Sequence, residues 1–193
     1  MSKIVVVMGK SSTGKDTIYR EILKRTKLGK IVPYTTRPIR TGEQHGVDYF
    51  FVNEEFIEKN KDKIIEIRTY NTVHGKWSYF EMNDEQVNSE KDLIFITTLE
   101  GYDGFLKYFG KNKLVPVYID LDDGIRLQRA LERERKQEKP KYAEMCRRYL
   151  ADAEDFSEEN LNALNINKRF NNLDLENVIS EIIDYLKSEG INL

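Results

Sequence analysis

Near its N-terminus the chain reads Gly9-Lys10-Ser11-Ser12-Thr13-Gly14-Lys15-Asp16-Thr17, a glycine-rich segment between two apolar ones. Residues 3–8 before it are mostly apolar and β-branched, which is typical of a buried parallel strand. After it, over residues 17–27, Ile18, Ile22 and Leu23 fall on one face of a helix. A strand, a glycine loop, a lysine and a helix in this order predict a P-loop.

A P-loop binds phosphate mainly through its backbone. Its glycines let N–H groups curl around an anion, the helix start adds partial positive charge, and Lys15 reaches the outer phosphates. We therefore expect all nine residues of this segment to form the ATP-binding loop; the alternative is a Gly/Ser loop that only joins strand to helix. Asp16 stands where the usual motif has Ser or Thr.

The bulk composition excludes several classes of protein. The 193 residues fit one α/β domain with a sizeable core, and the net charge of −2, with both signs interspersed, suggests neither a nucleic-acid nor a membrane surface. Cys146 is the only cysteine, so no internal disulfide can form. The first apolar run is too short for a signal peptide. These features predict a cytoplasmic protein.

A mostly β segment follows the first strand, loop and helix. We expect strands at residues 31–33, 47–52, 63–70 and 73–80, a short helix at 54–59, and a turn near His74. Residues 33–82 therefore form a small, mostly β insertion.

The α/β pattern then resumes with apolar strands at 93–96 and 114–119 around a helix at 100–109. Pro116 inside the second strand suggests an edge or a bulge. Asp122 can cap an arginine-rich helix, residues 136–141 read as a charged connection, and a further helix holds Arg147 and Arg148. A short strand at 164–166 and a last helix from about Asp174 complete the expected elements.

Residues 35–52, TTRPIRTGEQHGVDYFFV, closely resemble the guanylate kinase signature, in which T-T-R-x-x-R-x-G-E precedes G-x-D-Y. The resemblance covers essentially the whole chain. It implies a single P-loop kinase domain over residues 1–193, of α/β class. Its parallel core sheet would be flanked by helices and would carry a small, mostly β acceptor-binding insertion at 33–82 and a helical lid at about 126–148.

The resemblance also implies which residues hold the acceptor nucleotide. Arg37, Arg40 and Tyr49 match the residues that bind its phosphate, and guanidinium groups suit that role because they form bidentate, charge-assisted bonds. Glu66 matches the carboxylate that accepts hydrogen bonds from the N1 and N2 groups of guanine. The alternative is a solvated basic loop with a core tyrosine and an exposed strand glutamate.

The sequence departs from the family pattern around the base. Pro33 stands where a serine is common, and Ser78-Tyr79-Phe80, with Trp77 just before it, replaces the usual Tyr-Gly-Ser/Thr segment. Ile96 and Thr98 replace two aspartates after the next core strand. Ser78 and Thr98 are the candidates for the remaining polar contacts with the acceptor.

The arginine-rich segment resembles the family lid, which carries two arginines four residues apart and a third on the next helix. Arg129, Arg133 and Arg148 fit this spacing, and Arg135 and Arg147 are alternatives if the gap is placed differently. Cations that close over ATP neutralise the transferred phosphoryl group and exclude water. The alternative is a solvent-facing, salt-bridged helix.

The activity implied by the resemblance is transfer of the ATP γ-phosphoryl group to a nucleoside monophosphate, GMP in the family, with Mg²⁺. Asp16 replaces the metal-binding hydroxyl, and Ile96 and Thr98 replace the carboxylates, so we expect Asp16 to support the magnesium ion. The alternative is that Asp16 is only an acidic residue in the first turn of the helix, with no role in metal binding. The alternatives are a same-fold kinase for another phosphorylated acceptor, such as a ribose phosphate, and a non-catalytic interaction module. The partners are then small nucleotides, and the protein a monomer or homodimer.

Overall fold

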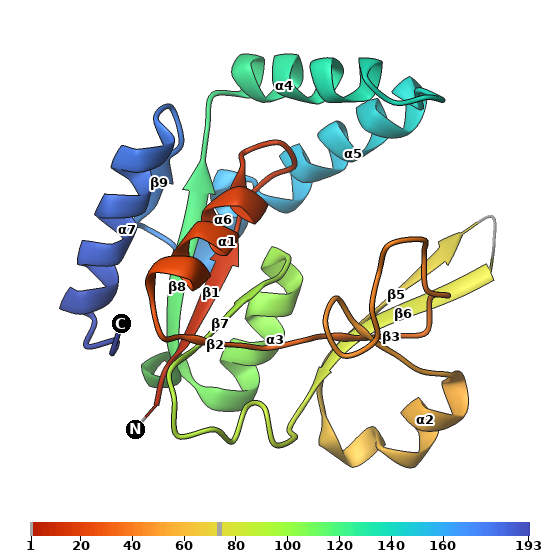
Figure 1. Ribbon diagram of the computed structural model, residues 1–193, viewed down its shortest axis with the longest axis vertical. Coiled ribbons are helices and arrows are strands. Elements are labelled where there is room, and N and C mark those ends of the chain that lie inside the picture. The colour runs from red at the N-terminus through yellow and green to blue at the C-terminus, as the bar shows by residue number, and fades with distance from the viewer. Residues whose placement is uncertain (1, 73–74) are drawn as a thin grey trace.

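The computed structural model describes residues 2–72 and 75–193. Its centre is a five-stranded sheet in which every pair of neighbouring strands is parallel (Figure 1). In sheet order the strands are β2 (Gly29–Lys30), β7 (Leu93–Ile96), β1 (Ile4–Met8), β8 (Leu114–Asp120) and β9 (Arg169–Asn171). The P-loop thus leaves the middle strand of the sheet.

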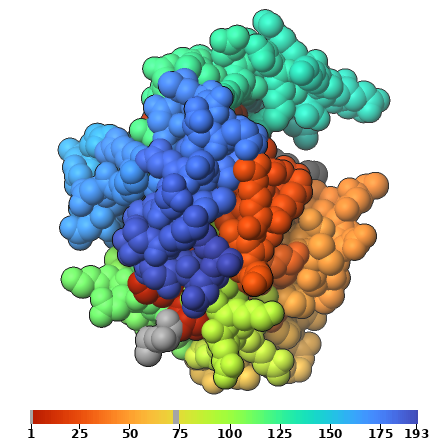
Figure 2. Space-filling view, turned by 60° about the vertical axis from the view of Figure 1, so that its left-hand side comes forward, coloured from red at the N-terminus to blue at the C-terminus, as the bar shows by residue number. Residues whose placement is uncertain are grey.

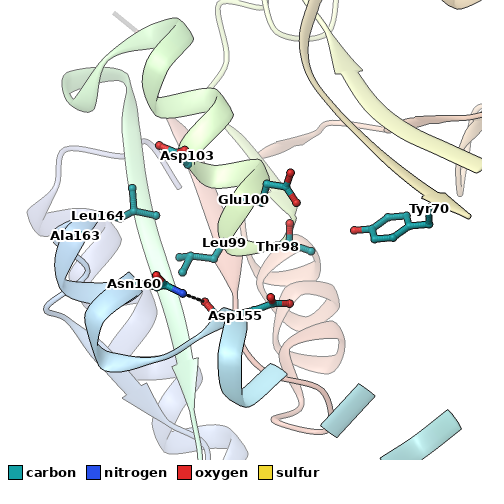
Figure 3. Close-up of a pocket in the computed structure, with 9 residues that line it drawn as sticks. All are labelled: Tyr70, Thr98, Leu99, Glu100, Asp103, Asp155, Asn160, Ala163 and Leu164. Carbon is teal, nitrogen blue, oxygen red and sulfur yellow. Dashed lines mark hydrogen bonds between the residues drawn. The ribbon is translucent and has the colours of Figure 1, made fainter. Parts of the chain in front are cut away.

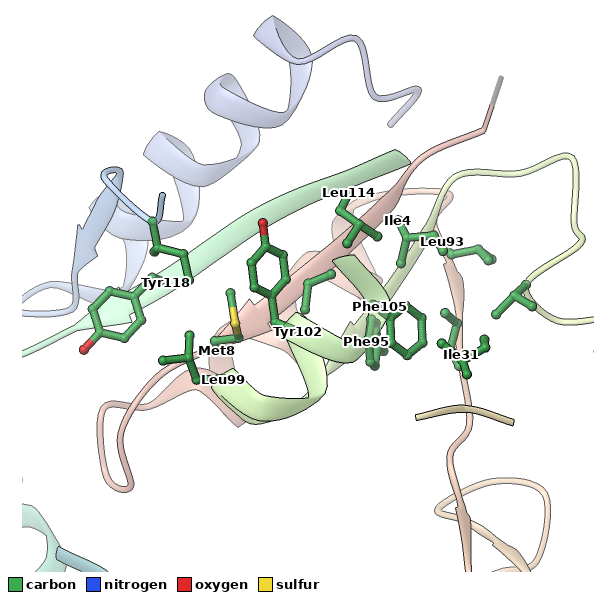
Figure 4. Close-up of a cluster of buried hydrophobic side chains, with 14 of the residues drawn as sticks. Ile4, Met8, Ile31, Leu93, Phe95, Leu99, Tyr102, Phe105, Leu114 and Tyr118 are labelled. Carbon is green, nitrogen blue, oxygen red and sulfur yellow. The ribbon is translucent and has the colours of Figure 1, made fainter. Parts of the chain in front are cut away.

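Strand alternation divides the core between the two faces of this sheet. Ile4, Val6 and Met8 belong to one buried cluster, whereas Val5 and Val7 belong to another. The first cluster includes residues of α3 (Leu99–Phe109) and α6 (Glu158–Ala163), and Figure 4 shows its side chains. The second includes residues of α1 (Lys15–Arg25) and α7 (Leu175–Ser188), which lie side by side in Figure 2.

The insertion forms a second sheet. Its order is β4 (Phe50–Phe51), β3 (Tyr34–Thr35), β6 (Gly75–Met82) and β5 (Ile64–Thr72), with the short helices α2 (Glu54–Lys59) and η1 (Lys61–Lys63) before β5. β5 and β6 form a long antiparallel pair, and helix α3 of the main body packs against β5.

A helical hairpin projects from the other side of the molecule (Figure 1). It consists of α4 (Asp123–Arg135) and α5 (Tyr142–Asp155), joined by residues 136–141. Asp122 caps α4 by accepting a hydrogen bond from the Ile125 N–H at 3.0 Å. Before it, η2 (Lys111–Lys113) leads into β8.

Most expected elements are confirmed, but the expected strand at 164–166 is wrong. Those residues follow the end of α6, where Asn165 turns the chain with a φ of 56°, and the strand β9 begins at Arg169. The expected strands at 31–33 and 47–52 also shift, to β2 and to the two-residue β4. The expected turn at His74 lies outside the described residues.

Pro116 lies in β8, which has strands on both sides in the sheet order. Pairing with β9 begins only at Tyr118, so at Pro116 the strand has one partner, β1. The missing proline N–H is tolerated because the strand is locally an edge there. In the described part of the chain, no helix combines the length and apolarity needed to span a membrane.

Candidate active site

The backbone of the P-loop depends on its two glycines. Gly14 has a φ of 88°, a left-handed conformation, and a Cβ there would lie 2.3 Å from Asn172 Nδ2. A Cβ at Gly9 would lie 2.5 Å from the Ile119 carbonyl oxygen. Helix α1 starts at Lys15 directly after Gly14, so the first N–H groups of the helix open onto the loop.

Residues distant in sequence hold this loop from outside. Buried Asn172 donates from Nδ2 to the Thr13 carbonyl oxygen at 2.7 Å. The Ser11 N–H donates to Asp152 Oδ2 at 2.7 Å, and Arg126 Nη1 donates to the Ser11 carbonyl oxygen at 3.0 Å. The loop is therefore fixed to β9 at one end and to the helical hairpin at the other.

Arg126 is a charged side chain with no solvent exposure. Its Nε and Nη2 contact Asp123 Oδ1 at 2.9 and 2.8 Å, its Nη1 lies 3.7 Å from Asp152 Oδ2, and its guanidinium lies 4.5 Å from the ring centroid of Tyr149. A buried charge requires such partners. We call Arg126, Asp123, Tyr149 and Asp152 the Arg126 cluster; it joins the start of α4, the end of α5 and the P-loop.

Lys15 and Asp16 lie together at the start of α1. Lys15 Nζ is 3.9 Å from Asp16 Oδ2, and the Asp16 side chain is 69% exposed. Asp16 also lines a cavity of about 470 Å³ whose other lining residues include Pro33, Tyr49 and Ile96. The P-loop helix, Ile96 of β7 and the insertion therefore line one cavity.

Asp16 is the candidate for holding a metal. Within residues 2–72 and 75–193, no cluster of three or more His, Cys, Asp or Glu side chains is placed to bind a metal ion. Mg²⁺ needs no such cluster, because it is commonly held by one or two carboxylates together with substrate phosphates and water. An exposed carboxylate beside the P-loop lysine fits that pattern. Thr17, the next residue of α1, is also exposed.

The three expected lid arginines lie in different settings. Arg129 donates from Nη2 to the Asn172 carbonyl oxygen at 3.2 Å and so lies beside the P-loop. Arg133 is exposed on α4, and Arg148 on α5 lies 3.7 Å from Glu144. Of the alternatives, Arg147 pairs with Glu144 and Arg135 is exposed at the end of α4. Only Arg129 is thus brought to the loop.

The expected phosphate-binding residues of the insertion meet around Glu43. Arg37, 3% exposed, makes two parallel bonds to the Glu43 carboxylate at 2.8 and 3.0 Å, and the Arg40 N–H donates to the same group at 2.8 Å. The hydrogen bond from Arg37 lowers the pKa of Glu43. The Arg37 guanidinium lies 5.4 Å from the ring centroid of Tyr49, whose pKa burial raises. Glu43 therefore holds Arg37 in a fixed orientation beside Tyr49.

Glu66 lies on β5 but is not a solitary carboxylate. Arg68 Nη2 is 2.7 Å from Glu66 Oε1, and Arg68 Nε donates to Glu66 Oε2 at 3.1 Å. Glu81, opposite Glu66 on β6, lies 3.4 Å from Arg68 Nη2. Burial, together with a hydrogen bond to Glu66, raises the pKa of Glu81 well above its ordinary value.

Ser78 and Thr98 are separated by the structure. Ser78 pairs with Thr69 on β5, so its side chain lies on the opposite face of the sheet from Glu66, and its hydroxyl contacts Thr69 Oγ1 at 2.9 Å. Tyr79, which pairs with Arg68, lies on the same face as Glu66. Thr98 caps α3 and accepts a hydrogen bond from Arg68 Nη1 at 3.2 Å, so it does join Glu66 and Arg68.

Sequence reasoning missed the residues that hold the site together. Arg126 and Asp152 gave no signal beyond a charged helix, and Arg68 and Glu81 resembled ordinary strand residues. Asn172 lies between β9 and α7, where an asparagine is commonly a turn or cap residue, so it gave no specific signal either.

These features define an α/β P-loop protein with an inserted β-sheet and a helical hairpin beside its phosphate-binding loop. Residues 1–189 match the family model described as guanylate kinase. The chain belongs to the guanylate kinase family.

Its relatives include the guanylate kinase of Thermotoga maritima, 31% identical over 140 residues that cover 68% of this chain and 66% of that protein. The guanylate kinase of Fusobacterium nucleatum is 36% identical over 106 residues, covering 52% and 56%. Both alignments span less than two thirds of the relative's own length. The crystal structure of the Anaplasma phagocytophilum guanylate kinase shares the fold, with a TM-score of 0.68 at 20% identity over 97% of this chain and 86% of that one.

Proposed function

We propose that the protein transfers the γ-phosphoryl group of ATP to a nucleoside monophosphate, with GMP as the first candidate. One observation carries the proposal: Asp16, at the end of the P-loop, and Tyr49, beside Arg37, line the same cavity. A donor phosphate on the loop and an acceptor phosphate near Arg37 would therefore face each other, as an in-line transfer requires.

The reaction needs no protein nucleophile. An anionic oxygen of the acceptor phosphate attacks the γ-phosphorus, the bond from that phosphorus to the β–γ bridging oxygen breaks, and ADP leaves with the electron pair. Lys15 and the P-loop amides hold the donor phosphates, and Arg129 adds positive charge from the hairpin. Asp16 would hold Mg²⁺ directly or through water, and the ion would supply positive charge to the donor phosphates.

We assign the acceptor to residues 33–82 and the closing movement over ATP to the lid at 126–148, in a single kinase domain. Arg37, Arg40 and Tyr49 would bind the acceptor phosphate. Arg133 and Arg148 are exposed here, so they would contribute only once the hairpin closes. A lone exposed cysteine supports a reducing, cytoplasmic setting.

The test is a coupled assay of ADP release with GMP, AMP, UMP, CMP and ribose phosphates as acceptors. We expect turnover with a nucleoside monophosphate and a loss of at least about 100-fold in Lys15→Ala. Lys24→Ala is the matched control, because Lys24 is an exposed lysine on the same helix with a 69% exposed side chain. Turnover only with a ribose phosphate would favour the sugar-phosphate kinase; no turnover with any acceptor would favour the interaction module.

A further inference from the structure

A row of tyrosines leads from the phosphate-binding residues of the insertion to a second cavity. The ring centroids of Tyr49 and Tyr79 are 5.9 Å apart, and those of Tyr79 and Tyr70 are also 5.9 Å apart. Tyr70 lines a cavity of about 380 Å³ together with Thr98 and Glu100. In Figure 3 Tyr70 lies on one side of it and the start of α3 on the other. A nucleotide whose phosphate lies at Arg37 would extend its base toward this cavity.

Glu66 is poorly placed to meet that base. Its side chain is 6% exposed, and helix α3 lies so close that a Cβ at Gly104 would be 2.5 Å from Glu66 Cβ. Both of its carboxylate oxygens contact Arg68, at 2.7 and 3.1 Å. The carboxylate that the family resemblance assigns to the N1 and N2 groups of guanine is therefore buried and already paired with Arg68.

Thr98 lines the cavity, and Arg68 adjoins it through its hydrogen bond to Thr98. Among the paired side chains of Arg68, Glu66 and Glu81, that of Arg68 is the most exposed: its exposed fraction is 10%, against 6% for Glu66 and 1% for Glu81. Its Nη1 donates to Thr98 Oγ1 at 3.2 Å and carries a second N–H. Thr98 Oγ1 also accepts from the Gly101 N–H at 3.1 Å. With both lone pairs of that oxygen engaged, the threonine hydroxyl can only donate. Both groups can therefore donate to an acceptor atom of a ligand.

The charge around the cavity decides what kind of acceptor atom fits. Glu100, Asp103 and Asp155 line it, so a second phosphate or a carboxylate would meet repulsion. A neutral carbonyl oxygen would not, and Tyr70, 46% exposed, offers an aromatic face on which a flat base can stack. These charges favour a nucleobase carbonyl over a ribose phosphate.

We infer that Arg68, oriented by Glu66 and Glu81, is the specificity-determining residue of the acceptor site and that it reads, with Thr98, the O6 carbonyl of a 6-oxopurine. The inference rests on the proposed kinase activity and narrows the range of acceptors to 6-oxopurine nucleotides. A guanine N2 group is then not read by a carboxylate, so GMP and IMP become comparable acceptors. AMP, which presents an amino group at this position, leaves two donors without a partner.

The test compares kcat/KM for GMP, IMP and AMP in the wild-type protein and in Arg68→Met, which retains much of the side-chain bulk. In the wild type we expect GMP and IMP to agree within about threefold and AMP to be at least about 100-fold poorer. In Arg68→Met we expect the KM for GMP and for IMP to rise together by at least about tenfold, with the KM for ATP unchanged. Arg25→Met, at an exposed arginine paired with Glu176, is the matched control.

Arg68→Met leaves Glu66 without its cation, so Arg68→Met/Glu66→Gln provides a second variant in which no buried charge is stranded. It should show the same equal loss for GMP and IMP. A wild-type preference of tenfold or more for GMP over IMP overturns the inference and leaves the kinase activity standing. No turnover with any nucleoside monophosphate overturns both.

Discussion

At the scale of single residues, Asp16 is the only acidic residue of the P-loop segment, whose other charged residues, Lys10 and Lys15, are basic. Its carboxylate lies 3.9 Å from Lys15 Nζ, is 69% exposed, and shares a cavity with Ile96. We predict that Asp16→Asn raises the half-saturating Mg²⁺ concentration at saturating ATP by about tenfold, since a charged hard ligand becomes a neutral one. Asp16→Ser should recover part of that affinity.

The measurement is a titration of the coupled assay with Mg²⁺ and with Mn²⁺ for each variant. Glu21→Gln, at a carboxylate of the same helix that pairs with Lys24, is the control and should leave the metal dependence unchanged. If both Asp16 variants keep the wild-type metal dependence, Asp16 is an acid at a helix N-terminus and not a metal-supporting group.

Glu81 makes stability depend on pH in the direction opposite to that of most carboxylates. Burial and the hydrogen bond to Glu66 raise its pKa well above 4.5 in the folded protein. Below pH 4.5 both folded and unfolded chains keep this proton; as the pH rises, the unfolded chain releases it first, so stability falls until the folded pKa is passed.

Glu81→Gln abolishes this titration while keeping a donor toward Glu66. We therefore predict that its free energy of unfolding relative to wild type, from urea denaturation, increases as the pH rises above 4.5. Glu58→Gln, at an exposed residue paired with Lys61, should show no such trend. A pH-independent difference for Glu81→Gln would mean that Glu81 is ionised in the folded protein.

At the scale of secondary-structure elements, the Arg126 cluster links the hairpin to the P-loop. Asp152, near the end of α5, accepts a hydrogen bond from the Ser11 N–H at 2.7 Å, and Arg126 donates to the Ser11 carbonyl oxygen. A movement of α5 relative to α4 therefore changes the support of the loop amide. We predict that Asp152→Ala destabilises the protein by about 1–3 kcal/mol, the range for a lost hydrogen bond to a charged group.

The same variant should speed amide hydrogen exchange at Ser11 more than at residues of β1, because only the loop loses its acceptor. Asp152→Asn keeps an oxygen acceptor and should restore most of the protection. Equal acceleration throughout β1 and α1 would show that Asp152 supports the fold as a whole and not the loop.

How far each element could be predicted depends on its length and burial. β1, β7 and β8 are continuous apolar runs, and the expected boundaries of β7 agree with the structure. β3, β4 and β9 contain two or three residues, too few to show a period, and exist only through pairing with distant strands. The face taken by the Ser78 side chain could not be predicted for a related reason, since strand register decides it.

At the scale of the whole molecule, some residues of the candidate site lie in local sequence motifs, whereas others come together only through the tertiary fold. The P-loop and Arg37 lie in compact motifs that the sequence shows directly. The contacts of Ser11 with Arg126 and Asp152, and of Thr13 with Asn172, join residues 115, 141 and 159 positions apart. No local sequence pattern predicts such contacts, because they depend on the order of the strands in the sheet, which is a property of the tertiary structure.

The contact between Asn172 and the P-loop sets an order of events during synthesis. The side chain that occupies the space beside Gly14 is synthesised 158 residues later than that glycine. β1 likewise needs β7 and β8 on its two sides. The nascent chain therefore carries its P-loop without this contact until β9 and Asn172 have emerged, and nucleotide can stabilise the completed loop only from that point on.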